Sequence, residues 1–80
     1  MNNYEEKVKS IISKIAKVKK ESIKLEDDLV QKYNMDSMQR VEVVIELEKE
    51  FDVSISDEVA LTLRTVKKIV DLLEQTVNQK

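Results

Sequence analysis

The chain has 80 residues, of which 41% are hydrophobic and 38% are charged, and its formal net charge is −2. It contains no Cys, His or Gly, which excludes a disulfide framework, a zinc site, a Ser-His-Asp triad and the glycine-rich loops that bind phosphates. Most enzyme classes are therefore closed to this sequence, and a binding or carrier role in one small domain, residues 1–80, is expected.

A first amphipathic helix is predicted over about residues 3–17, where apolar side chains recur at helical spacing from Tyr4 to Ala16. The periodicity then fails for about eighteen residues, from Val18 to Met35. This is long for a structureless connection, so we expect a partly ordered loop with a short turn inside the segment LEDDLVQKY.

A second helix is predicted from Ser37 to about Phe51, because Asp36 and Gln39 have the spacing of a capping box. A short helix follows, from Ser56 to about Leu63, and a last helix begins after Thr65. The predicted fold is all-α: a small antiparallel four-helix bundle with three long helices, a short third helix and a long loop between helices one and two.

The net charge conceals a segregation along the chain. Residues 1–24 carry seven Lys against three acids, whereas residues 25–63 carry eleven acids against three bases. The acidic middle argues against nucleic-acid binding and favours a basic protein partner, although a solvated acidic face is an equally common explanation. No apolar run is long enough for a membrane span or a signal peptide, so we expect a monomeric, cytoplasmic protein.

The second helix carries two apolar rows. One is an ordinary core stripe, made of Val44, Leu47 and Phe51 with Val43 beside them. The other has the spacing i, i+3, i+7 and consists of Met38, Val41 and Ile45. This second row is either core under the long loop or part of a docking strip, defined as Met38 and Ile45 with the bordering Glu42, Glu46 and Glu48.

Three roles compete for Ser37. It can cap the second helix, which is the commonest meaning of Asp-Ser before an apolar-periodic run. It can be a nucleophile, but the chain offers no base to activate it. It can be a modification acceptor, because the free N–H groups and the dipole of a first helical turn favour an attached phosphate. The spacing does not separate the first role from the third.

The segment MDSMQRVEVVIELEKEFDVSISDE, followed by LRTVKKIVDLL, resembles the acyl carrier protein family. That family has Asp-Ser-Leu at the start of an acidic second helix and a Glu-Glu-Phe-Asp type of ending, and the likeness covers nearly the whole chain. It implies a carrier, not an enzyme, whose Ser37 receives 4′-phosphopantetheine from coenzyme A. A separate, Mg²⁺-dependent phosphopantetheinyl transferase performs that reaction, so the carrier needs no base of its own.

The resemblance also implies roles for the neighbours of Ser37. Asp36 assists the metal site of the transferase, and Met38 belongs to the attachment site as well as to the recognition face. The rest of that face consists of Glu42, Ile45, Glu46 and Glu48. The implied partners are acyl-transfer, ketosynthase or ligase enzymes with basic docking surfaces. Arg40 and Lys49 make this helix less acidic than in fatty-acid carriers, so polyketide, nonribosomal-peptide and other specialised pathways stay open.

A bound acyl chain is expected between the second helix and the short third helix, which should open at low cost. The predicted lining is Val44, Leu47, Val59, Ala60 and Leu63.

The alternative to a carrier is an unmodified helical adaptor that binds a basic protein through the acidic second helix. Asn34 stands where the family usually has Gly, and Asn tolerates a left-handed backbone well.

Overall fold

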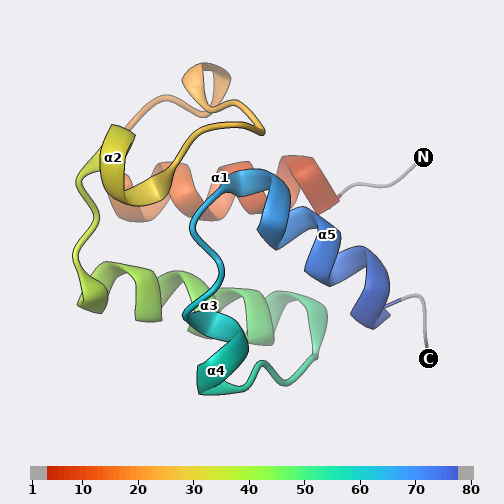
Figure 1. The fold of residues 1–80 in the computed structure, drawn as a ribbon. Coiled ribbons are helices and arrows are strands. Elements are labelled where there is room, and N and C mark those ends of the chain that lie inside the picture. Colours follow the sequence, from red (N-terminus) through yellow and green to blue (C-terminus); the bar gives the residue numbers. More distant parts are fainter. Residues whose placement is uncertain (1–3, 78–80) are drawn as a thin grey trace.

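The computed structural model describes residues 4–77, and these residues form an all-α bundle (Figure 1). The elements are α1 (Tyr4–Ala16), the 3₁₀ turn η1 (Lys20–Ser22), α2 (Leu29–Tyr33), α3 (Ser37–Phe51), α4 (Asp57–Ala60) and α5 (Val66–Val77). The predicted fold class is confirmed. The proposed start of the first helix at residue 3 lies outside the described residues, and the turn expected in the long loop is α2.

Side-chain caps explain why three of the helices begin where they do. The Asp36 carboxylate accepts a hydrogen bond from Gln39 N at 2.8 Å, and the Gln39 side chain accepts one from Asp36 N, which confirms the capping box of α3. Ser56 caps α4 through a hydrogen bond from Val59 N. Asp28 caps α2 in the same way and is a cap that the periodicity did not indicate.

Left-handed residues end three helices, although the chain has no glycine to place there. Lys17, Asn34 and Asp52 have φ values of 60°, 54° and 53°. After α1 and α3 the next amide closes the turn, from Val18 N to Ser13 O and from Val53 N to Glu48 O. The left-handed conformation expected of Asn34 is therefore confirmed.

The core forms where α1 packs against α3 and α5. Its fully buried side chains are Val8, Ile12, Ile23, Leu29, Val43, Leu47, Val66, Ile69 and Leu73. Val43 and Leu47 face this core from α3, whereas Val44 and Phe51 are half-buried at its edges. The buried side of α3 is therefore centred on Val43 and Leu47, slightly to one side of the predicted row. Phe51 packs edge-to-face on Tyr4, with ring centroids 5.5 Å apart.

The long loop is fastened to the chain just before and at the start of α5. Leu29 N donates to Arg64 O at 2.7 Å, Val66 N to Asp27 O at 3.2 Å and Lys67 N to Leu25 O at 2.9 Å. Ile23 and Leu29 anchor the loop in the core, as expected from their apolar character. The loop is therefore a structured part of the bundle rather than a free connection.

The short helix α4 ends at Ala60, three residues earlier than predicted. Beyond it the backbone tightens into turns in which Thr62 N donates to Val59 O and Leu63 N to Ala60 O. The Thr62 hydroxyl also donates to Val59 O, at 2.7 Å. Along this change of direction Leu63 is buried in the core, whereas Leu61 is 72% exposed. Burial of Leu63 therefore takes precedence over helical spacing.

Candidate functional site

Ser37 is the first residue of α3 and is exposed. Asp36, not Ser37, caps the helix, since it is the Asp36 carboxylate that accepts from Gln39 N. Among the residues that the structure describes, none forms a hydrogen bond with the Ser37 hydroxyl. The capping role that competed with modification is thus filled by another residue, and the hydroxyl is accessible.

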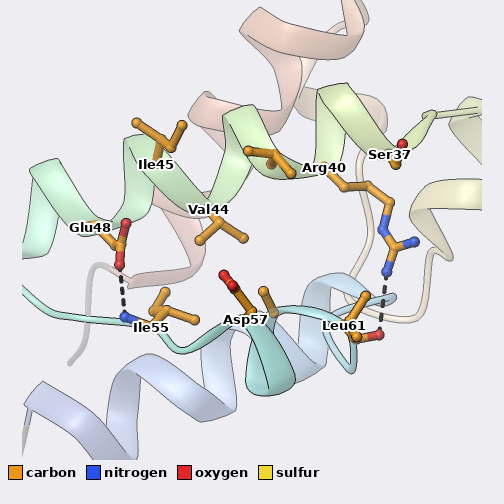
Figure 2. Close-up of a pocket in the computed structure, with 10 residues that line it drawn as sticks. Ser37, Arg40, Val44, Ile45, Glu48, Ile55, Asp57 and Leu61 are labelled. Carbon is orange, nitrogen blue, oxygen red and sulfur yellow. Dashed lines mark hydrogen bonds between the residues drawn. The ribbon is translucent and has the colours of Figure 1, made fainter.

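A groove of about 280 Å³ runs from Ser37 along α3, between this helix and residues 55–61, which we call the α4 segment (Figure 2). Its apolar wall consists of Val41, Val44, Ile45, Ile55, Ala60 and Leu61. Of the lining predicted from the sequence, Val44 and Ala60 are present. Leu47 and Leu63 are instead buried in the core, and Val59 lies on the surface outside the groove.

Two charged side chains of α3 connect the helix to the α4 segment (Figure 2). The Glu48 carboxylate accepts a hydrogen bond from Ile55 N at 2.8 Å, just before α4. Arg40 Nη2 donates to the Leu61 carbonyl oxygen at 3.4 Å, just after α4. Neither contact was predictable from the sequence, because both depend on where the α4 segment lies in space. Only the position of Arg40, one turn after Ser37, could have drawn attention to it.

The second apolar row of α3 faces solvent. The exposed fractions of Met38, Val41 and Ile45 are 76%, 56% and 43%. Leu61, which is 72% exposed, lines the groove together with Val41 and Ile45 and extends this apolar surface onto the α4 segment. Of the two explanations for the row, core or docking strip, the burial therefore favours the docking strip.

Acidic and basic side chains border the docking strip on the side of α1. Glu42 is exposed and Glu46 is half-buried, and both line a hollow that also contains Lys14 and Lys17. Glu48 is half-buried and turned toward the α4 segment. The face is acidic along α3, but Lys14 of α1 and Lys17, just after α1, line the same hollow as its glutamates.

Metal-binding clusters and membrane-spanning helices are absent from the described part of the chain. Within residues 4–77, no group of three or more His, Cys, Asp or Glu side chains is placed to hold a metal ion. No helix in that range combines the length and apolar character needed to cross a membrane.

Comparison with known proteins gives concordant matches. A family model described as "Phosphopantetheine attachment site" matches residues 6–73. The acyl carrier protein of Buchnera aphidicola subsp. Schizaphis graminum is 44% identical over 73 residues, which cover 91% of this chain and 92% of that protein. The acyl carrier protein of Buchnera aphidicola subsp. Acyrthosiphon pisum (strain 5A) is 38% identical over 74 residues, or 92% of each chain.

Proposed function

Because the chain belongs to the acyl carrier protein family, whose members carry phosphopantetheine and are not enzymes, we propose that it holds acyl groups as thioesters on an arm attached to Ser37. The observation that carries this assignment is the Ser37 hydroxyl at the mouth of the groove, which is exposed and forms no hydrogen bond with the described residues. The arm supplies the thiol that a chain without cysteine lacks. The whole chain is proposed to act as one carrier domain.

The surroundings of Ser37 fit a phosphate ester. The hydroxyl stands in the first turn of a 15-residue helix, where the dipole favours negative charge. During loading, the Ser37 oxygen forms a bond to the phosphorus of the pantetheine phosphate as the bond to the ADP portion of coenzyme A breaks. The hydroxyl proton passes to the transferase, which also supplies the metal ion.

The groove is the proposed shelter for the acyl chain. Its walls are mostly aliphatic, as an acyl chain requires, and it begins at the residue that would carry the arm. The volume of about 280 Å³ is small, so longer acyl chains need an outward movement of the α4 segment. The short α4 is held to α3 by few hydrogen bonds, which makes that movement possible at low cost.

The docking strip is the proposed contact for partner enzymes. It presents exposed methionine and isoleucine side chains beside Glu42 and Glu46, and matches a surface with Arg or Lys around a shallow apolar centre. The phosphopantetheinyl transferase and acyl-transfer, ketosynthase or ligase enzymes are the expected partners. Fatty-acid synthesis is one setting, and polyketide or related synthesis is the other that the mixed charges of α3 leave open.

Intact mass after incubation with a broad-specificity phosphopantetheinyl transferase, coenzyme A and Mg²⁺ tests the attachment. We expect the mass of one phosphopantetheine to be added to the wild-type chain and none to Ser37→Ala. Ser10→Ala and Ser54→Ala are controls, because both serines are exposed and neither caps a helix, so both variants are expected to load normally. Loading of Ser37→Ala would refute the site, and an unmodified wild-type chain would favour the adaptor.

A further inference from the structure

Arg40 has an unusual environment at the Ser37 end of the groove. Its side chain leaves α3 and extends toward the N-terminal end of that helix, below Ser37 (Figure 2). Nη2 makes one long hydrogen bond, 3.4 Å, to the Leu61 carbonyl. Nε is buried and has no hydrogen-bond partner. Among the described residues no carboxylate pairs with this guanidinium, although Asp57 lines the same groove.

The second arginine of the chain shows what a satisfied guanidinium looks like in this protein. Arg64 is exposed, and its Nη2 lies 3.3 Å from one carboxylate oxygen of Asp28 and 3.4 Å from the other. A cationic N–H that is removed from water without an acceptor is unfavourable, so such groups are normally paired in native structures. The Nε–H of Arg40 is therefore a buried donor without an acceptor, and Nη2 has only the long hydrogen bond to the Leu61 carbonyl.

We propose that Arg40 binds the phosphodiester that joins the arm to Ser37; the inference rests on the function proposed above. Residues at positions i and i+3 of a helix have Cβ atoms about 5–6 Å apart, well within the reach of an arginine. The two free oxygens of a phosphodiester match two N–H groups on one edge of a guanidinium. The dipole of α3 acts on the same phosphate in the same direction.

Binding of the phosphodiester changes the contact between α3 and α4. When Nη2 turns to the phosphate, the Leu61 carbonyl loses its hydrogen bond from Arg40, whereas the Glu48 contact at Ile55 is unaffected. The end of α4 nearest Ser37 is then released and the other end stays fastened. Arg40 is thus a positioning residue that fixes the root of the arm and loosens the groove at the end where the acyl chain enters.

Nuclear magnetic resonance of the isotope-labelled protein before and after loading tests the proposal. The chain has two arginines, so two Nε–H signals are expected, and each is assigned by substitution with Lys. Loading should shift the Arg40 signal and leave the Arg64 signal in place. It should also speed amide exchange at Leu61 and Thr62 several-fold. In Arg40→Gln the ³¹P line should be narrower than in the wild type, because the phosphate is no longer held.

The matched control is Arg64→Gln, which removes the same charge far from Ser37 in the sequence and should leave the ³¹P line unchanged. Intact mass is measured first for every variant, so failure to load counts against the attachment site and not against Arg40. With loading complete, an Arg40 Nε–H signal that does not move would overturn the proposal. A shifted signal with unchanged exchange at Leu61 and Thr62 would support phosphate binding and refute the release of α4.

Discussion

Asp27 is the one charged residue among residues 4–77 that is buried, with an exposed fraction of 7%. Burial disfavours its ionised form, but hydrogen bonds from the Tyr33 hydroxyl, Lys24 N and the Lys32 ammonium outweigh that effect, so the pKa of Asp27 lies below its ordinary value. Burial and the bond to Asp27 together raise the pKa of Tyr33. One carboxylate therefore organises the long loop around itself.

We predict that Asp27→Asn lowers the free energy of unfolding by about 2 kcal/mol at neutral pH, because hydrogen bonds to a charged acceptor are lost inside the protein. A folded pKa below the ordinary value of 3.8 means that the ionised carboxylate stabilises the fold above that pH. This contribution disappears as the pH falls through the lowered pKa. Urea unfolding from neutral pH downward should show a steeper loss for the wild type than for Asp27→Asn.

Tyr33→Phe is the control for that prediction, because it removes one of the hydrogen bonds but keeps the carboxylate. It should cost about 1 kcal/mol and retain most of the acid sensitivity. Equal acid sensitivity in the wild type and Asp27→Asn would show that the other carboxylates, Asp28 among them, dominate the pH dependence.

At the scale of single elements, α4 is unusual because it has four residues and depends on side chains of another helix for support. Isolated helices of this length do not persist in water. The contacts from Glu48 to Ile55 N and from Arg40 to Leu61 O hold its two ends against α3. We therefore regard α4 and its flanking turns as the part of the bundle that opens most easily.

Glu48→Ala should lower the free energy of opening in the α4 segment by about 1 kcal/mol, because Ile55 N loses a charge-assisted partner. Amide exchange in residues 55–61 should then accelerate about fivefold, while exchange in α1 and α5 stays the same. Glu42→Ala, an exposed glutamate on the same helix, is the matched control and should have no effect there. Acceleration of equal size in both variants would mean that Glu48 stabilises α3 generally and not α4.

The second element with a functional prediction is the docking strip of α3. Glu42→Gln with Glu46→Gln should reduce kcat/KM for loading by the transferase by up to about thirtyfold, since each of the two ion pairs is worth up to about 1 kcal/mol. The dependence on ionic strength should also flatten. Substitution by Gln avoids placing a new cation next to Lys14, which lines the same hollow.

The control for this prediction is the pair Glu21→Gln and Glu26→Gln, which makes the same change of net charge in the exposed long loop. Glu5 and Glu6 are less suitable, because they pair with Lys9 and Lys20. Helical content by circular dichroism should be the same for all variants. If both pairs of substitutions slow loading equally, net charge and not the docking strip guides the encounter.

At the scale of the whole molecule, the sequence predicted those features of the bundle that depend on one residue and its own neighbourhood, namely helix caps and turns. The capping box at Asp36, the cap at Ser56 and the left-handed turn at Asn34 follow from side chains next to the backbone groups they serve. The sequence could not decide whether Val41 is buried, because the two rows of α3 are about equally apolar. Exposure of Val41 depends on which neighbour covers which row, and only the tertiary structure fixes that.

The groove shows the same limit. Its predicted lining contained Leu47 and Leu63, which belong to the core, and omitted Ile55 and Arg40. Helical projection identifies which side of α3 is apolar, but not the path of the chain from Asp52 to Arg64. That path is set by the burial of Leu63 and by the backbone hydrogen bonds of the long loop, which lie far away in the sequence.

Those loop hydrogen bonds bear on the acyl chain that we propose the groove holds. Arg64 and Val66 are hydrogen-bonded to the long loop, and Val53 is hydrogen-bonded to the end of α3. The segment from Val53 to Arg64 is therefore held at both ends. A segment held in this way can move away from α3 only until one of these backbone hydrogen bonds breaks. For the carrier proposed above, we therefore predict a limit to the length of acyl chain that this segment can cover, and the remainder of a longer chain would be exposed to water or to the next enzyme.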